Sequence, residues 1–255
     1  MKSKDILASS NKTIVILGPT GSGKTGVAIE IAKEIGGEII SADSRAIYKG
    51  MDIGTAKPTI AEMDGVVHYG LDLVEPGERF TVADWKEYAE QKICSISASG
   101  KVPIVAGGTG LYIDALVFGY SFTQDAKLKY TDRKEIDPRF EIFGIRVEPD
   151  DQLRQRLRQR IDKMFGEELF EETKMLVEKY GWDSQAMKSN IYWFVWEYLQ
   201  GRMGLEEAKE RSFFEDWHLA KRQMTWFKRN EEINWLELEQ IKPAVLKCIQ
   251  NEQRK

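Results

Sequence analysis

The sequence predicts an α/β fold, in which a core built on a parallel β-sheet carries an attached helical lobe. Two features of the apolar pattern lead to this prediction. Over residues 1–120, short apolar runs alternate with segments of helical period, as successive β-α-β units do. After residue 150 the period is helical almost without interruption to about residue 230. We expect the sheet core in residues 1–120, a polar connector in residues 121–138, and a returning strand, the helical lobe and a C-terminal strand and helix in residues 139–255.

The first two predicted strands flank one amphipathic helix. The strands are the apolar runs TIVIL (13–17) and EIISA (38–42), which are compact enough to be buried. Between them lies TGVAIEIAKEI (25–35), and a Gly-Gly pair ends this helix. Five apolar side chains recur in it at helical spacing: Val27, Ala28, Ile31, Ala32 and Ile35.

The remaining elements of the core follow in chain order. TVADWKEYAEQKICSISASG (81–100) predicts a longer helix, with threonine near its start and glycine after its end. The strand VPIVA (102–106) runs into GGTG, and a short helix, LYIDALVFG (111–119), comes next. Beyond the connector we expect strands within FEIFGIRV (140–147) and INWLEL (233–238).

Composition restricts the function classes. The net charge is −4, so nucleic-acid binding would need a local basic face. Cys94 and Cys248 have no metal or redox spacing, and we expect both to be buried in a protein of a reducing compartment. No signal-peptide pattern and no bilayer-spanning stretch is present. We therefore expect a cytoplasmic protein without membrane attachment, and a monomer.

The segment GPTGSGKT (18–25) is a complete Walker A pattern between a strand and a helix, which predicts a P-loop NTPase-like core. Its glycines let backbone N–H groups converge on an anion, and the N-terminus of the helix adds partial positive charge. Lys24 would supply a point charge for phosphates, and the Thr25 hydroxyl would bind Mg²⁺. The pattern predicts an anion cradle and does not specify a nucleotide.

The third strand ends in VAGGTG (105–110), without the carboxylate of a Walker B motif, and no glutamate stands where it would activate water. Hydrolysis of ATP or GTP needs such a group, so the sequence disfavours an ATPase or GTPase. A small-molecule kinase stays open, because Asp43 follows the second strand and is placed to take the proton of a substrate hydroxyl.

Five segments together resemble the tRNA dimethylallyltransferase (isopentenyl-tRNA transferase) family. The resemblance runs through residues 13–119 and about 138–238. The segment of residues 41–59 is the most specific. The segments are GPTGSGKT (18–25), SADSRAIYKGMDIGTAKPT (41–59), VEPGERFTVADW (74–85), VAGGTGLYIDAL (105–116) and LAKRQMTWFKR (219–229).

The resemblance implies that the loop holds the diphosphate of dimethylallyl diphosphate, with Mg²⁺ as cofactor. The prenyl group would pass to N6 of an adenosine next to the anticodon of tRNA, with Asp43, Thr25 and Arg160 as catalytic residues and Asp43 as general base. Thr25 would be the metal ligand. The expected diphosphate-binding residues are Gly18, Thr20, Gly21, Ser22, Gly23, Lys24, Thr25, Arg156 and Arg160, with Arg160 preferred over Arg156. The expected contacts to the tRNA anticodon stem-loop are Asp43, Ser44, Arg45, Ala46, Thr109, Lys221 and Arg222.

These roles agree with the chemistry. A leaving diphosphate gains negative charge, so a preorganised cradle stabilises the transition state more than the ground state. A carboxylate near the weakly nucleophilic exocyclic amine helps the new C–N bond to form. The alternative for Asp43 is that it caps a helix or acts on the metal indirectly. The alternative for Arg154 and Arg158 is that they form a solvated basic face. The segment IYWFVWEY (191–198) predicts an amphipathic helix that buries Trp193 and Trp196.

The chain departs from the family pattern at three places. Between Gly119 and Arg139 only a short connector stands where the family usually carries a longer helical insertion. Ile191-Tyr192 replaces a common Gly-Tyr, and Asp216-Trp217-His218 replaces a common Thr-Arg. We expect an intact diphosphate pocket and an altered grip on tRNA. Three other functions stay open: prenyl transfer to AMP or other adenine nucleotides, tRNA binding without turnover, and a P-loop kinase.

Overall fold

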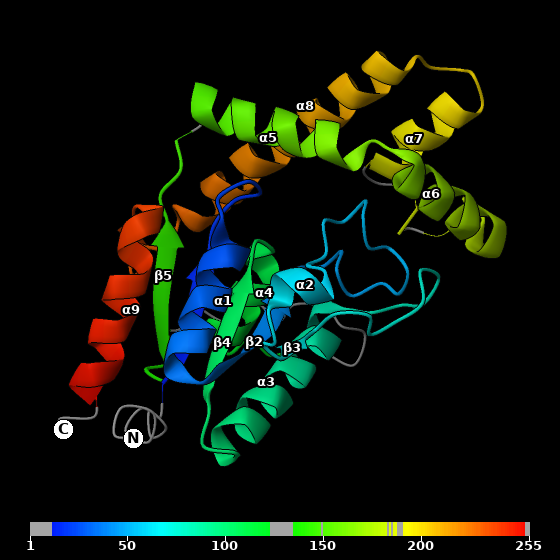
Figure 1. Ribbon diagram of the computed structural model, residues 1–255. Coiled ribbons are helices and arrows are strands. Elements are labelled where there is room, and N and C mark those ends of the chain that lie inside the picture. Colours follow the sequence, from blue (N-terminus) through cyan, green and yellow to red (C-terminus); the bar gives the residue numbers. More distant parts are fainter. Residues whose placement is uncertain are drawn as a thin grey trace.

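The computed structural model describes residues 12–122, 135–148, 150–182, 184, 186–187 and 191–252. Within these residues one parallel sheet has the strand order β3-β2-β4-β1-β5-β6 (Figure 1). The α/β prediction is thereby confirmed. The strands are β1 (Thr13–Leu17), β2 (Gly37–Ala42), β3 (His68–Tyr69), β4 (Val102–Gly107), β5 (Phe140–Ile145) and β6 (Asn234–Leu236).

Helices cover both faces of the sheet, and a further group of helices lies beyond the carboxyl ends of its strands. α1 and α9 share a hydrophobic cluster with one face, whereas α3 and α4 share a second cluster with the other. α5 to α8 form the helical lobe, which lies beyond the carboxyl ends of the strands (Figure 1). The helices are α1 (Lys24–Ile35), α2 (Ile60–Met63), α3 (Val82–Ala98), α4 (Gly110–Val117), α5 (Asp151–Met164), α6 (Glu167–Tyr180), α7 (Ile191–Leu199), α8 (Leu205–Phe227) and α9 (Leu238–Glu252).

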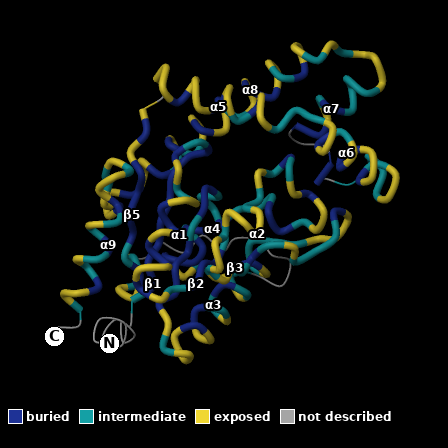
Figure 2. Tube along the Cα trace, viewed as in Figure 1, coloured by how far each residue is buried: buried dark blue, intermediate teal, exposed yellow. Residues whose placement is uncertain are grey.

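The central strand β1 is buried on both faces because its residues alternate between the two clusters. Ile14 and Ile16 pack with α1 and α9, whereas Val15 and Leu17 pack with α3 and α4. This is the burial that a parallel sheet with helices on both sides requires. Figure 2 shows the strands as buried and the outer faces of the helices as exposed. All five apolar residues that the sequence predicted to recur along α1 are buried.

Several local predictions can be compared with the structure. The predicted strands and the long helix with its threonine cap are confirmed, and β3 and α2 add two short elements that the pattern did not indicate. Cys94 is exposed and Cys248 is half-buried, so the prediction that both cysteines are buried was wrong. Within the described residues, every helix is too short or too polar to cross a bilayer. Most of the connector, residues 123–134, lies outside the described residues.

The loop between β1 and α1 joins the core to the lobe. Gly21 (φ 75°) and Gly23 (φ 84°) both have the left-handed backbone that glycine tolerates best. A Cβ on Gly21 would lie 2.9 Å from a methyl carbon of Leu157 and 3.1 Å from one of Leu153. α5 therefore packs directly on the glycine-rich loop, and this contact brings the side chains of the lobe to the phosphate-binding motif.

Candidate active site

A cavity of about 670 Å³ lies where the lobe meets the carboxyl ends of the strands. Its wall combines five segments that are far apart in the sequence: the glycine-rich loop, the loops after β2 and β4, and the facing sides of α5 and α8. The predicted site residues on this wall are Thr20, Lys24, Thr25, Asp43, Ser44, Arg45, Ala46, Thr109, Arg160 and Arg222.

Arg160 of α5 ties the lobe to the glycine-rich loop. Its Nη1 donates a 2.6 Å hydrogen bond to the Thr20 hydroxyl, and its Nη2 lies 3.3 Å from a carboxylate oxygen of Asp216 on α8. The Lys24 ammonium donates a 3.2 Å hydrogen bond to the carbonyl oxygen of Pro19. Two cationic side chains therefore converge on the N-terminus of α1, where the helix dipole also favours an anion.

Burial is the main cause that lowers the pKa of Lys24 to about 8, and the positive charge of Arg160 acts in the same direction. Asp43 and Asp216 act in the opposite direction, which shows that both carboxylates lie near the ammonium group. A partly desolvated cation beside a second cation is unfavourable without a ligand. Perturbed groups of this kind gather at functional sites, and here an anion would offset the cost.

Gln223 of α8 connects the glycine-rich loop with the loop after β4. Its Oε1 accepts a 2.8 Å hydrogen bond from the backbone N–H of Thr20, and its Nε2 donates one of 2.9 Å to the Gly108 carbonyl. A Cβ on Gly108 would lie 2.4 Å from that nitrogen, so glycine is required for this approach. We did not predict Gln223 from the sequence, although it lies within the segment LAKRQMTWFKR that we had singled out.

The loop after β2 is fixed around Asp43. A carboxylate oxygen of Asp43 accepts a 2.8 Å hydrogen bond from the backbone N–H of Arg45. The Thr109 hydroxyl accepts a 2.9 Å hydrogen bond from the backbone N–H of Ser44 and lies 3.3 Å from the Ser44 hydroxyl. Burial lowers the pKa of Arg45 from its usual value. A carboxylate, two hydroxyls and a guanidinium thus share the cavity with the cationic loop.

Several predicted residues lie outside the cavity wall. Gly18, Gly21, Ser22 and Gly23 shape the glycine-rich loop without lining the cavity, and within the described part of the chain the buried Ser22 hydroxyl has no hydrogen-bond partner. Two exposed basic residues lie apart from it, Arg156 on α5 and Lys221 on α8, and the Lys221 ammonium is 4.9 Å from the centre of the Trp217 ring.

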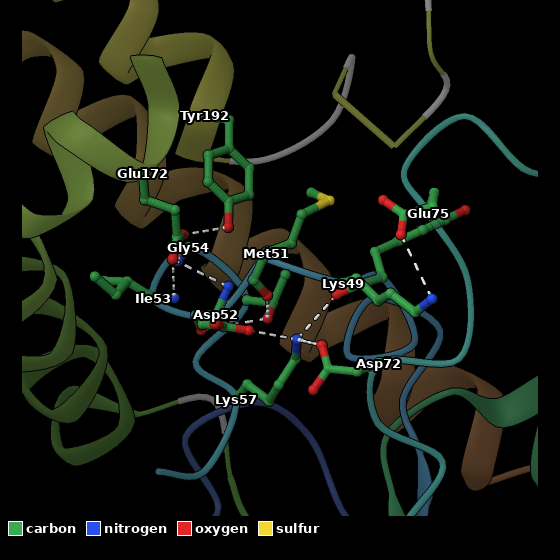
Figure 3. A network of polar contacts seen from close by, with 12 residues as sticks. Lys49, Met51, Asp52, Ile53, Gly54, Lys57, Asp72, Glu75, Glu172 and Tyr192 are labelled. Carbon is green, nitrogen blue, oxygen red and sulfur yellow. Dashed lines mark hydrogen bonds and ion pairs between the residues drawn. The ribbon is translucent and has the colours of Figure 1, made fainter. Parts of the chain in front are cut away.

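A buried carboxylate holds the cavity-lining loop of residues 51–58 to the lobe, as Figure 3 shows. Glu172 of α6 accepts hydrogen bonds from the backbone N–H groups of Asp52 (3.1 Å), Ile53 (2.9 Å) and Gly54 (3.0 Å). The Tyr192 hydroxyl of α7 donates a fourth, of 2.6 Å. All four partners are donors, which suits a carboxylate acceptor.

Lys57 closes the same loop from the other side (Figure 3). Its side chain is only 5% exposed, and its ammonium donates to the Tyr48 carbonyl (2.9 Å) and to the carboxylates of Asp52 (2.5 Å) and Asp72 (2.6 Å). The loop is therefore anchored to the lobe through Glu172 and to the core through Lys57. These two contacts fix its position at the cavity.

Replacing Tyr192 by phenylalanine is expected to reduce the free energy of unfolding by about 1.5–3 kcal/mol, because it removes a hydrogen bond to a buried carboxylate. Urea unfolding of the wild type and Y192F measures this difference. Y180F is the matched control: the Tyr180 hydroxyl donates to Glu75, whose side chain is 36% exposed, so water can replace the lost hydroxyl. Equal losses in the two variants would contradict the importance assigned to the Glu172 contact.

The structure corrects the prediction made for α7. Ile191, Tyr192 and Val195 form its buried side, whereas Trp193 is 42% exposed and lines the cavity. The prediction that Trp193 and Trp196 are buried was therefore wrong, since Trp196 is only half-buried. The Trp193 ring lies edge-on to Trp182, with a centroid separation of 5.5 Å. Trp193 thus places an aromatic side chain on the cavity wall.

The fold and the cavity define an α/β protein in which a glycine-rich loop faces a cavity beside the helical lobe. A family model described as IPP transferase matches residues 46–136 and 125–230, and one described as isopentenyl transferase matches residues 11–77. The tRNA dimethylallyltransferase of Acetivibrio thermocellus is 38% identical over 89% of this chain and 91% of its own length. That of Geobacillus thermodenitrificans is 34% identical over 90% of this chain and 91% of its own length. The chain belongs to the tRNA dimethylallyltransferase family.

Solved structures agree with this membership. The crystal structure of a tRNA isopentenylpyrophosphate transferase from Staphylococcus epidermidis superposes with a TM-score of 0.82 at 32% identity, over 94% of this chain and 98% of that one. The corresponding structure from Bacillus halodurans gives a TM-score of 0.82 at 29% identity, over 96% and 97% of the two chains. The sheet with its helical lobe is therefore the architecture of these enzymes.

Proposed function

We propose that this protein transfers a dimethylallyl group from dimethylallyl diphosphate to N6 of an adenosine adjacent to the anticodon of tRNA. The observation that carries the proposal is the joint presence, in one cavity, of the cationic glycine-rich loop and the Asp43 loop. Relatives that are named tRNA dimethylallyltransferases, 38% and 34% identical over most of the chain, support it.

The diphosphate is held at the glycine-rich loop in this proposal. Lys24 and Arg160 supply positive charge, the Thr20 hydroxyl supplies a polar contact, and the N-terminus of α1 supplies backbone N–H groups. Breaking the C–O bond leaves an electron pair on the diphosphate oxygen, so these groups interact more strongly with the leaving group than with the ester.

Mg²⁺ fits beside this diphosphate. Mg²⁺ prefers oxygen ligands and usually keeps several waters alongside one or two protein ligands and the phosphates of the substrate. Thr25 offers an exposed hydroxyl on the cavity wall. Among the described residues no cluster of three or more acidic, histidine or cysteine side chains offers a cage. Thr25 would hold the ion, which would neutralise charge on the diphosphate.

The adenosine approaches from the side of the loop after β2. Its base leaves the stack of the RNA to reach the cavity. The Asp43 carboxylate accepts the proton of the amine as the new C–N bond forms. Ser44, Arg45, Ala46 and Thr109 surround the base and its phosphates in this arrangement, with Arg222 on the cavity wall and Lys221 beside it on the same helix.

The short connector in residues 121–138 takes the place of a longer insertion in this proposal. The alignment with the Acetivibrio relative extends over 288 positions, more than the 255 residues of this chain, although it covers only 89% of the chain. The relative therefore has residues that this chain lacks. The match of the IPP transferase model also divides at residues 125–136. A weaker grip on the anticodon stem is the expected consequence.

The test is to incubate the protein with dimethylallyl diphosphate, Mg²⁺ and an anticodon stem-loop that carries consecutive adenosines, and to detect prenylated adenosine by mass spectrometry. AMP is offered as acceptor in parallel. Product on the stem-loop supports the proposal, and product on AMP alone would redirect it to adenine nucleotides. Folded protein without product on either acceptor would refute it. Gel filtration of the same sample tests the expected monomer, and a tRNA substrate is consistent with action in the cytoplasm.

A further inference from the structure

Asp216 brings a negative charge to a site built for an anion. It lies on α8, on the cavity wall, and its side chain is 18% exposed. Its carboxylate faces Arg160, whose other amino group is hydrogen-bonded to Thr20 in the glycine-rich loop. The cation that would meet a diphosphate is thus already in contact with an anion supplied by the protein.

The contact between Asp216 and Arg160 is incomplete as a hydrogen-bonded pair. The two groups approach to 3.3 Å, yet within the described part of the chain neither the buried Oδ2 of Asp216 nor the buried Nε of Arg160 has a hydrogen-bond partner. Burial raises the pKa of Asp216, and Arg160 and Lys24 only partly oppose this. A buried carboxylate with such a loose partner does not stabilise the fold well, and Arg160 is free to exchange it for a better acceptor.

We propose that Asp216 weakens the hold of the cavity on the diphosphate and so promotes release of the pyrophosphate product. Near the loop, two cations, Lys24 and Arg160, are balanced by two carboxylates, Asp43 and Asp216. An incoming diphosphate must displace Asp216 from Arg160 and then remain beside it. Like charges brought together in a partly desolvated site repel strongly. This inference rests on the proposed function, since it presumes that the loop binds a diphosphate.

The repulsion acts more strongly on the product than on the substrate. Heterolysis of the C–O bond leaves the electron pair on the diphosphate, so pyrophosphate carries one more negative charge than the ester. Each added charge increases the repulsion from Asp216 in proportion. A cradle of Lys24 and Arg160 alone would hold the product more tightly than the substrate, and Asp216 reduces that difference.

The experiment measures binding of inorganic pyrophosphate with Mg²⁺ to the full chain by isothermal titration calorimetry. D216N keeps the shape of the side chain and removes its charge, and it is expected to bind pyrophosphate at least about tenfold more tightly than the wild type. E215Q is the matched comparison: it removes the same charge from the next residue of α8, which also lines the cavity but is exposed. Its affinity is expected to stay within about twofold of the wild type, because exposed charges are screened.

Three results would overturn the inference. Unchanged or weaker binding by D216N would mean that Asp216 is inert or positions Arg160. Equal gains in D216N and E215Q would mean that only net charge matters. Absence of pyrophosphate binding in the wild type and in D216N would instead refute the diphosphate site itself. D216S serves the same comparison if D216N does not fold. In the prenyl-transfer assay, D216N should be more strongly inhibited by pyrophosphate than the wild type.

Discussion

Replacing Asp43 by asparagine is expected to lower the single-turnover rate of prenyl transfer by about 10²–10⁴-fold, the usual contribution of a general base. The amide keeps an oxygen that can accept the hydrogen bond from the Arg45 N–H, so the loop after β2 should keep its shape. What the variant loses is the ability to take the proton of the adenine amine. The rate is measured with dimethylallyl diphosphate and a stem-loop, both saturating.

Two conditions separate this effect from an indirect one. Asp43 raises the pKa of Lys24, so its loss lowers that pKa below about 8, and the assay belongs below pH 7, where Lys24 stays charged. Pyrophosphate should bind D43N at that pH no more weakly than it binds the wild type, because the substitution removes a negative charge near Lys24. A D43N enzyme with a rate within tenfold of the wild type would assign Asp43 to a cap or an indirect metal role.

The elements of the core were predictable because their causes are local. The apolar run of β1, the glycines after it and the helical spacing along α1 are contained in neighbouring residues, and the loop that they form is the diphosphate site of the proposal. Asp43 was predictable from its place after β2. Each of these features is determined by neighbouring residues within one strand, turn or helix.

The contacts that complete the cavity depend on residues far apart in the chain. Gln223 meets Thr20 across 203 positions, and Arg160 meets the same threonine across 140. Glu172 reaches Gly54 across 118. A helical period predicts that one face of α7 is apolar, but it does not determine which face meets the core, so Tyr192 is buried and Trp193 faces the cavity. Such pairings follow only once the lobe has packed on the sheet.

Replacing Lys24 by methionine is expected to weaken binding of pyrophosphate by about 10²–10³-fold, the range found when one charge-stabilising donor is removed. Methionine fills similar space without charge. K33M is the matched control, since Lys33 is an exposed lysine on the same helix that pairs with Asp64. It should bind pyrophosphate as the wild type does. Loss of binding in both variants, or in neither, would contradict the role of Lys24 in the cradle.

The lowered pKa of Lys24 predicts the pH dependence of the same binding. The ligand-free protein loses this charge as pH rises through about 8, so the affinity for pyrophosphate should fall above that pH in the wild type and not in K24M.

The contribution of Lys24 to the free energy of unfolding changes with pH in the opposite direction. Between about pH 8 and the ordinary lysine pKa of 10.5, the unfolded chain binds more protons at Lys24 than the folded one, so this residue adds stability as pH rises. Below pH 8 the buried charge is a cost, and K24M should therefore unfold at a higher temperature than the wild type when no ligand is bound. A cation that destabilises the free protein and is required for binding is what a site for a polyphosphate demands, because the ligand supplies the compensating charge.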